Sequence, residues 1–315
     1  VMLLQEVNPL PEMAGRYVTA MKRFGLQYVS VHQVDACGVR LAPGLAVVPG
    51  LNNGLAVLAK APLLLRKITG LKLSGGVGGC NDYMGFQTGS LRYALIAEIE
   101  NPNTGRKFLT VSLHLHSGIE RSLFFLQKIN ESVAEGKVRR EDFDRIVTAI
   151  EKDQQRRLHE IRVLLKEKER LNTEGAYQGV LVGGDFNFEP DEPEYQELER
   201  AGLKDTYVMG SPQTEVYRLA PQRNVLAGQH LRNVPSTLLA ALKRLPASMQ
   251  EDFLEGYQKG ISEARRVDFM FLMMHPSGAM KGCLRQELFG QEADSGPGSD
   301  HYGVLVTYIA DATQC

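Results

Sequence analysis

Residues 179–187 read Gly-Val-Leu-Val-Gly-Gly-Asp-Phe-Asn. The run from Gly179 to Gly184 is short, apolar and bounded by small residues, a pattern typical of a buried β-strand. Asp185 and Asn187 follow directly, so this strand is predicted to deliver a carboxylate and an amide to its end. Such side chains at the strand ends of a packed sheet are what an active site on an α/β scaffold requires, because the rigid sheet fixes their positions.

Further strand-like runs lie on both sides of this segment. The chain opens in one of them, Val1 to Leu4, and Asn101 to Gly105 predicts a hairpin turn that joins two others as an antiparallel pair. The remaining runs cover Gln27–His32, Leu45–Val48, Asn53–Ala59, Leu91–Glu100, Lys107–His114, Arg266–Met273 and Gly303–Ile309.

Helical patterns separate these strands, first near the N-terminus and then in two longer stretches, Glu120–Asn172 and Ser236–Ser262. The chain shows no internal repeat and no low-complexity linker. We therefore predict one α/β domain over residues 1–315, with helical insertions at about residues 120–150 and 231–262.

The segment from Ser74 to Gly79 is rich in glycine and resembles a phosphate-binding loop at first sight. It lacks the Gly-Lys-Ser/Thr ending of a P-loop. We therefore interpret it as a flexible surface loop.

The composition restricts the class of protein. With 43% hydrophobic residues among 315, the chain can bury one sizeable core, which excludes disordered and collagen-like classes. The 36 Lys and Arg residues against 37 Asp and Glu residues give a net charge of −1, which argues mildly against an avid, nonspecific DNA-binding protein. The four cysteines are far apart, so free thiols are favoured over a disulfide framework or a zinc site.

No segment of the sequence is long and apolar enough to span a bilayer, because charges and prolines break the apolar stretches, as in Leu55–Leu65. The N-terminus does not resemble a signal peptide. A cytoplasmic and a secreted location both stay open, and a monomer is expected.

Polar side chains lie at or near the ends of most of these strands. They are Glu6, His114, Asp185, Asn187, Asp268, Asp300 and His301. Carboxylates without a neighbouring cysteine suit a hard, oxygen-liking ion, so Mg²⁺ or Mn²⁺ is predicted rather than zinc. Each acid also has a structural explanation: Glu6 could cap a helix, Asp185 could make an Asx-turn, and Asp268 could pair with a neighbouring arginine.

Five short blocks of sequence together match a known family. In chain order they are Leu4-Gln5-Glu6-Val7, Leu113-His114-Leu115, Gly184-Asp185-Phe186-Asn187, Arg266-Val267-Asp268-Phe269 and Ser299-Asp300-His301. They resemble, in residue type and order, the signature blocks of the endonuclease/exonuclease/phosphatase (DNase I-like) superfamily. The resemblance implies a four-layered α/β sandwich, in which two mainly antiparallel sheets pack face to face and helices cover them outside.

The resemblance also implies a role for each acid and amide. Glu6 would hold the divalent ion, with Asp300 assisting directly or through water, so that the metal offsets charge on a phosphoryl oxygen. Asp185 would orient or deprotonate the attacking water. Asn187 would donate a hydrogen bond to a non-bridging phosphate oxygen.

Two histidines complete the implied site. His301 would lie against the scissile phosphate, with Asp268 fixing its tautomer. His114 would be the second imidazole, which binds the phosphate or helps to protonate the leaving group. His116 falls on the same strand face as His114 but has no family counterpart, so we interpret it as a supporting or rim residue.

One element of the family pattern is missing. Members usually begin with a strand that carries an Asn, a few dozen residues before the Gln-Glu block, and this sequence has no room for it before Gln5. We therefore expect that the chain lacks its natural N-terminal strand.

The predicted function is that of a divalent-metal-dependent phosphoesterase of nuclease type, which hydrolyses a phosphodiester by attack of water on phosphorus. Its partner is a phosphoester substrate, either nucleic acid or a phospholipid head group. The alternatives are a sphingomyelinase-like lipid phosphodiesterase, an inositol phosphate phosphatase, and a catalytically impaired binding module of the same fold. A calcineurin-like two-metal phosphatase is disfavoured, because Phe188 stands where that class has a second Asp.

Two surface patterns bear on the substrate. Lys137–Arg140 and Arg156–Arg157 could form a basic rim, although solvated helix faces explain these charges as well. The leucines between Leu238 and Leu245 could face lipid, although their helical spacing more often indicates packing onto a core.

Overall fold

The computed structural model describes most of the chain. The described residues are 1–36, 39–42, 45–46, 53–80, 85–118, 123–172, 176–190, 192–207, 238–239, 242–243, 245–261, 268–274, 283–289 and 303–309.

The first sheet has the strand order β1-β5-β2. Its strands are β1 (Met2–Leu4), β5 (Asn53–Lys60) and β2 (Tyr28–Ala36), and both pairings are antiparallel. The central strand β5 contains the apolar run Leu55–Ala59, in which every residue is 0% exposed. A strand that is apolar at every position must be covered on both faces, so this sheet requires a layer on either side.

The second sheet has the strand order β10-β11-β9-β8-β7-β3-β4, and β6 also pairs with β7. Its strands are β10 (Lys204–Asp205), β11 (Asp268–Met274), β9 (Gly179–Asp185), β8 (Arg106–His114), β7 (Gly85–Asn101), β3 (Val39–Ala42), β4 (Leu45–Ala46) and β6 (Leu64–Cys80). Among the described strands of this sheet, β8 and β9 alone pair in parallel. A further antiparallel pair consists of β12 (Cys283–Phe289) and β13 (Gly303–Ile309).

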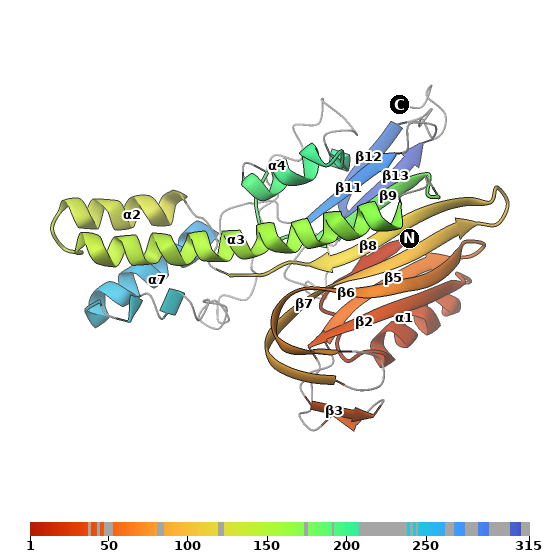
Figure 1. The fold of residues 1–315 in the computed structure, drawn as a ribbon, viewed down its shortest axis with the longest axis horizontal. Coiled ribbons are helices and arrows are strands. Elements are labelled where there is room, and N and C mark those ends of the chain that lie inside the picture. Colours follow the sequence, from red (N-terminus) through yellow and green to blue (C-terminus); the bar gives the residue numbers. More distant parts are fainter. Residues whose placement is uncertain are drawn as a thin grey trace.

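The two larger sheets face each other, with β2 against β6 and β7 and with β5 against β7 and β8. The helix α1 (Glu12–Arg23) packs on the first sheet, and α3 (Arg140–Leu171) lies over the second, with α4 (Pro193–Arg200) beside it (Figure 1). The order of layers is therefore helix, sheet, sheet, helix. The predicted four-layered α/β sandwich is confirmed.

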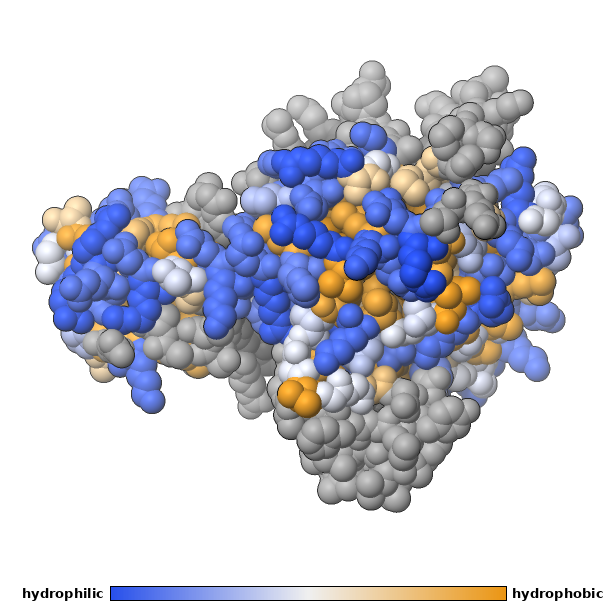
Figure 2. Space-filling model, viewed as in Figure 1, coloured by the Kyte–Doolittle hydropathy of each residue, from blue (hydrophilic) through white to orange (hydrophobic). Residues whose placement is uncertain are grey.

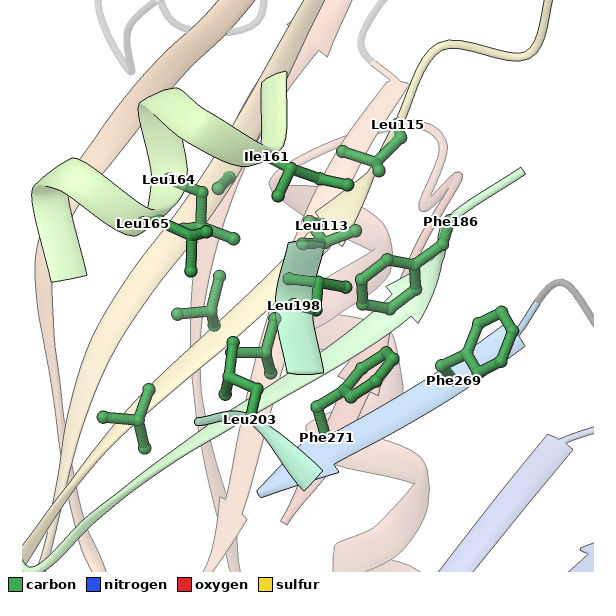
Figure 3. Packing of buried hydrophobic residues seen from close by; sticks show 14 of the residues in the cluster. Leu113, Leu115, Ile161, Leu164, Leu165, Phe186, Leu198, Leu203, Phe269 and Phe271 are labelled. Carbon is green, nitrogen blue, oxygen red and sulfur yellow. The ribbon is translucent and has the colours of Figure 1, made fainter. Parts of the chain in front are cut away.

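Aromatic side chains fill the core where β9 and β11 lie side by side. The ring of Phe271 lies 5.3 Å from that of Phe186 and 5.5 Å from those of Phe269 and Tyr195, measured between centroids. Figure 3 shows these phenylalanines together with leucines of α3. Aromatic pairs at such separations each contribute about 0.5–1.5 kcal/mol beyond the area they bury, so the cluster holds the two strands in place.

A separate hydrophobic cluster lies away from the sheets, where α2 (Leu123–Ala134) and α7 (Ala247–Ile261) pack with the first half of α3 (Figure 1). We call these three helical segments the helical lobe. The helices α2 and α7 fall within the two segments predicted as helical insertions, whereas α3 begins in the first of them and continues past residue 150. The boundaries of the insertions stay a prediction.

Three of the four leucines that could have faced lipid belong to the core of the helical lobe. Leu238, Leu242 and Leu245 are 0%, 1% and 6% exposed, and they pack inside the protein. The fourth, Leu239, is 46% exposed. Of the helices that the structure describes, none has the length and apolar character to cross a membrane.

The glycine-rich residues 74–79 form part of a strand, so the predicted flexible loop is wrong. They belong to β6 and pair with β7. Gly75 and Gly78 have φ angles of 109° and 101°, which residues with a Cβ rarely adopt, and the pairing register shifts between Gly75 and Val77. The glycines therefore allow the strand to bulge and bend rather than to leave the sheet.

Cys80 ends β6 in a buried position and is disulfide-bonded, so the expectation of free thiols is wrong for this residue. Its backbone N–H donates to Tyr93 Oη at 3.1 Å, and its carbonyl accepts from Gln33 Nε2 at 2.9 Å. Because Tyr93 lies on β7 and Gln33 on β2, this end of β6 is tied to both sheets.

Phe271→Ala should lower the free energy of unfolding by about 3–5 kcal/mol, because it leaves a cavity among three aromatic rings. Phe24→Ala is the matched control, since Phe24 is 79% exposed, and it should change stability by less than about 0.5 kcal/mol. Urea unfolding followed by circular dichroism measures both. Similar losses for the two variants would contradict the packing described.

Candidate active site

Three of the predicted site residues lie side by side at one edge of the second sheet. His114 is the last residue of β8 and stands opposite Asp185, the last residue of β9, in the parallel ladder. Asp268 is the first residue of β11 and stands opposite Asp185 in the antiparallel ladder. The three side chains therefore start from neighbouring strands at the same edge.

Glu6 joins this group from the first sheet. It follows β1, and its Oε1 lies 3.8 Å from His114 Nδ1, while Asp185 Oδ2 lies 3.5 Å from His114 Nε2. The His114 side chain is only 6% exposed and the Glu6 side chain is 66% exposed. The imidazole thus lies between two carboxylates, one at the solvent surface and one largely buried.

Two backbone positions in this group have an unusual conformation. Glu6 and Asn187 have φ angles of 53° and 54°, and they are the two non-glycine residues with positive φ in the described part of the chain. Such conformations cost about 1–3 kcal/mol and persist where the surrounding structure holds them. Both therefore point to constraints imposed at this edge.

Gln5 connects Glu6 to β8. Its Nε2 donates to Ser112 Oγ at 3.1 Å, and that hydroxyl donates to the Leu4 carbonyl at 3.2 Å. Ser112 lies two residues before His114 on β8. The two hydrogen bonds therefore fix the position of Glu6 relative to the imidazole.

The two carboxylate oxygens of Asp185 have different partners. Oδ1 accepts a hydrogen bond from the backbone N–H of Asn187 at 3.0 Å, which is the Asx-turn considered from the sequence. Oδ2 lies toward His114. The structural explanation of Asp185 therefore holds together with a chemical role, because each uses a different oxygen.

Asn187 is held by one of its two side-chain N–H groups. Its Nδ2 donates to the Leu115 carbonyl at 3.1 Å, and the Leu115 N–H in turn donates to the Asp185 carbonyl at 3.0 Å. An amide nitrogen has two hydrogens, so a second donor is left for a ligand.

Glycine at position 184 is required by the approach of β8. Gly184 has a φ of 150°, and a Cβ there would lie 1.9 Å from the Leu113 carbonyl oxygen. Any side chain would push the two strands apart. The glycine in the Gly-Asp-Phe-Asn block therefore allows His114 and Asp185 to meet.

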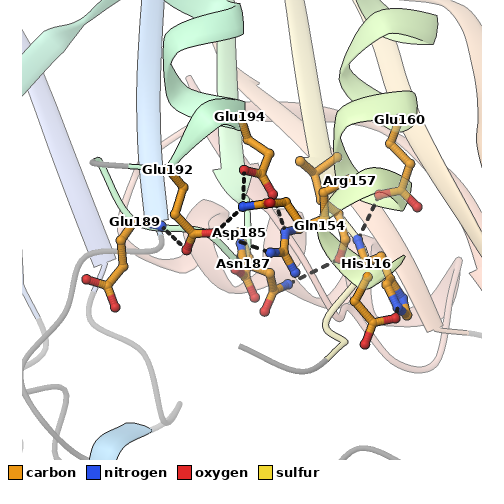
Figure 4. A network of polar contacts seen from close by, with 11 residues as sticks. His116, Gln154, Arg157, Glu160, Asp185, Asn187, Glu189, Glu192 and Glu194 are labelled. Carbon is orange, nitrogen blue, oxygen red and sulfur yellow. Dashed lines mark hydrogen bonds and ion pairs between the residues drawn. The ribbon is translucent and has the colours of Figure 1, made fainter. Parts of the chain in front are cut away.

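The helix α3 holds the loop after β9 through a buried ion cluster (Figure 4). Arg157 Nε donates to Glu194 Oε1 at 2.9 Å, and Arg157 Nη2 lies 3.4 Å from Glu192 Oε2. Glu192 Oε1 accepts from the Glu189 N–H at 3.1 Å. Burial raises the pKa of Glu192, Arg157 opposes the rise, and Glu194 adds to it.

The same helix holds the loop after β8. His116 Nε2 lies 2.9 Å from Asp153 Oδ1, and the His116 N–H donates to Glu160 Oε2 at 2.8 Å. The side chain of His116 is 14% exposed. His116 therefore supports the loop that follows His114 and does not line an exposed rim.

The basic residues considered from the sequence do not form one rim. Arg157 is 0% exposed, so its assignment to a basic rim is wrong. In the helical lobe, three basic side chains pair with acids of their own or the neighbouring turn, at 2.7–3.2 Å. These pairs are Lys137–Glu135, Arg139–Asp142 and Arg140–Asp144.

Asp35 and Arg92 are two charged residues near Glu6 that the sequence did not reveal. Asp35 lies on β2 and is 5% exposed; burial raises its pKa to about 7, Arg92 opposes the rise, and the charge of Glu6 adds to it. Arg92 Nη2 donates to Ser117 Oγ at 3.0 Å. An isolated acid within an otherwise uncharged strand is the signal that could have identified Asp35.

The donor chemistry of the site is compatible with a hard divalent cation. No group of three or more metal-binding side chains occurs among the residues that the structure describes. Mg²⁺, however, is usually held by one or two carboxylates and keeps several waters. The exposed carboxylate of Glu6 meets that requirement. Asp300 and His301, the other residues predicted for the site, lie outside the described residues.

Solved structures of other proteins are similar to this one. Truncated TDP2 from Caenorhabditis elegans is 13% identical, with a TM-score of 0.50, over 98% of this chain and 83% of that one. TDP2 from D. rerio, complexed with a single strand DNA product, is 15% identical, with a TM-score of 0.49, over 98% and 84%. An endonuclease/exonuclease/phosphatase from Bacteroides vulgatus is 14% identical, with a TM-score of 0.45, over 94% and 89%. No family model matches the sequence, and no curated protein sequence matches it significantly.

Arg157→Met should lower the free energy of unfolding by about 3–5 kcal/mol, because it leaves Glu192 and Glu194 buried without their cation. Arg162→Met is the matched control on the same helix. Arg162 is 59% exposed and lies 3.0 Å from Glu197, so its loss should change stability by about 0–1 kcal/mol. Urea titration at neutral pH compares the two, and an equal loss in both would refute the buried cluster.

Asp35→Asn should flatten the pH dependence of stability between about pH 4 and 7. The pKa of Asp35 is about 7 in the folded protein and near 3.8 in an unfolded chain. Between these values the folded state keeps a proton that the unfolded state has lost, so stability falls as pH rises, by up to about 1.4 kcal/mol per unit, and levels off above pH 7.

The measurement is a series of urea titrations of both proteins in EDTA. The difference in unfolding free energy, variant minus wild type, should increase from about pH 4 to about pH 7 and then stay constant. A difference that does not vary with pH would contradict the raised pKa of Asp35.

Proposed function

We propose that this chain, whose fold is that of the endonuclease/exonuclease/phosphatase (DNase I-like) superfamily, is a divalent-metal-dependent phosphoesterase that hydrolyses a phosphodiester. The observation that carries the proposal is the position of His114 between the carboxylates of Asp185 and Glu6. An imidazole between an oriented carboxylate and an exposed one is suited to hydrolysis of a charged ester.

Asp185 orients the attacking water and accepts its proton. One oxygen is occupied by the Asx-turn, which fixes the carboxylate, and the other is directed to the site. A carboxylate with a fixed orientation is an effective base, because a base must lie within hydrogen-bond reach of the proton that it accepts. Asp185 also lies beside His114, so both can contact the same phosphate group.

Asn187 and His114 bind the phosphate oxygens. Asn187 has a second N–H group beyond the one that holds Leu115, and it donates without adding negative charge beside the phosphate. His114 donates from its ring or transfers a proton to the leaving oxygen. Asp268 stands opposite Asp185 in the ladder. Its proposed role is to orient the imidazole of His301, which lies outside the described residues.

Glu6 is the residue that would hold the cation, with Asp300 assisting. A bound Mg²⁺ or Mn²⁺ would offset the charge that develops on a phosphoryl oxygen. The hydrogen bonds from Gln5 to Ser112 and from Ser112 to Leu4 keep Glu6 in place for this task.

A nuclease-type substrate is proposed in preference to a lipid. Of the four leucines that could have met acyl chains, Leu238, Leu242 and Leu245 are buried in the helical lobe, and Leu239 is 46% exposed, so they do not form a continuous apolar surface. A binding module that had lost its chemistry would be expected to lack some of the acids or histidines, and none of the predicted ones is absent from the sequence.

Asp185→Asn should reduce kcat for a small chromogenic phosphodiester by about 10²–10⁴-fold, because Asn keeps the acceptor of the Asx-turn but cannot take the proton. Asp144→Asn, at an exposed position on α3, is the control and should keep wild-type activity. Activity should also disappear in EDTA and return with Mg²⁺. Turnover that is unchanged in Asp185→Asn, or that is insensitive to EDTA, would refute the proposed mechanism.

A further inference from the structure

A surface cavity of about 780 Å³, largely open to solvent, lies between the glycine-rich part of β6 and the middle of α3. Its polar lining consists of Lys72, Ser74, Gly75, Gly76, Arg156 and His159. None of the described residues that line it is acidic. The proposed hydrolytic mechanism uses none of these side chains.

Lys72 is held by backbone carbonyls of its own strand. Its Nζ donates to the carbonyl oxygens of Gly76 and Gly78 at 2.8 and 3.0 Å, and no ion pair to it occurs among the described residues. Carbonyl groups hold the ammonium in position, but they carry no net charge to cancel its own. The bent strand therefore presents a fixed cation at the cavity.

The carboxylate of Glu160 lies behind the cavity wall and pairs with Arg156, not with Lys72. It is 0% exposed and accepts hydrogen bonds from Ser74 Oγ and from the His116 N–H, and its Oε1 lies 3.3 Å from Arg156 Nε. These three donors surround the carboxylate within the protein. Because Arg156 is paired with Glu160, Lys72 supplies the net positive charge of the cavity wall, and the exposed imidazole of His159 adds a polar group beside it.

The cavity adjoins the candidate active site. Glu160, whose carboxylate binds Ser74, also binds the backbone N–H of His116, two residues after His114. Ser74 stands opposite Arg92 in the β6–β7 ladder, and Arg92 donates to Ser117. Two independent connections thus link the cavity wall to the loop that follows His114.

A second anion site beside a phosphoester site favours a ligand with several phosphates. The apolar lining offers little to an acyl chain, because Leu73 is 2% exposed and Val163 packs against the core. A duplex would require a broad basic face, which a net charge of −1 does not indicate. A single strand requires only a local positive groove that follows its backbone.

We propose that this cavity binds a backbone phosphate of a single-stranded oligonucleotide while another phosphodiester of the same strand occupies the active site. The proposal rests on the function proposed above and assigns its substrate class. Lys72 is the central ligand of this second phosphate, and Arg156 and His159 flank it.

The test is equilibrium binding of fluorescein-labelled oligothymidylates to the full chain carrying Asp185→Asn, which prevents cleavage. For an eight-nucleotide strand, adding Lys72→Gln should weaken binding at least about fivefold and reduce the slope of log K against log salt by about 0.7. Lys72→Arg should restore both, since it keeps the charge. For a thymidine dinucleotide, which has a single internucleotide phosphate, Lys72→Gln should have no effect.

Lys22→Gln is the matched control, because Lys22 is exposed on α1 in the outer layer opposite α3 (Figure 1). It should leave binding of the eight-nucleotide strand unchanged. Thermal unfolding midpoints verify that each variant is folded.

The proposal would be overturned if Lys72→Gln and its parent bound the eight-nucleotide strand with equal affinity, or if Lys72→Gln and Lys72→Arg lost the same affinity. Binding to vesicles of phosphatidylserine and phosphatidylcholine is measured in parallel. A loss of binding by Lys72→Gln that occurs with these vesicles and not with the oligonucleotide would also overturn it. The function itself is tested separately by hydrolysis of the chromogenic phosphodiester by the wild-type chain. Loss of the binding effect with hydrolysis intact therefore refutes only the second phosphate site.

Discussion

The close parallel approach of β8 and β9 determines the geometry of the whole candidate site. It is possible because position 184 has no side chain, so the Leu113 carbonyl can lie where a Cβ would be. The approach sets His114 against Asp185 and places the Leu115 carbonyl within reach of Asn187. On its other side, β9 aligns Asp268 with the same point. The absence of a side chain at position 184 thus allows residues from three segments, far apart in the sequence, to lie close together.

The helix α3 stabilises this arrangement from outside the sheet. Asp153, Arg157 and Glu160 lie on one face of the helix and hold the loops after β8 and β9 (Figure 4). Buried charges of this kind add little net stability compared with apolar side chains, because desolvation offsets their attraction. Their contribution is to orientation, because their hydrogen bonds and ion pairs join α3 to the loops after β8 and β9. Figure 2 shows how hydrophilic residues nevertheless cover the outer surface along α3.

The sequence predicted the layered fold and the approximate positions of most strands, because apolar periodicity and block order depend on short segments. It could not predict that residues 74–79 stay in a strand, since glycine composition alone does not distinguish a bulge from a loop. It also suggested that Arg157 could be exposed, whereas the carboxylates that bury it come from residues 35 and 37 positions later. Asp35 escaped notice for the same reason: its importance depends on Glu6 and Arg92, which meet it only in the folded chain.

The continuity of α3 has a consequence for the evolution and engineering of the helical lobe. The helix has 32 residues, a length of roughly 48 Å, and it passes without interruption from the lobe to the sheet. The lobe therefore cannot be removed at a natural boundary. A shortened chain would have to begin the helix next to Asp153, and its first turn would contain four N–H groups without partners beside the ions that hold the loops after β8 and β9. The lobe is thus the part of the molecule that lets those ions lie in the interior of a helix rather than at its frayed end.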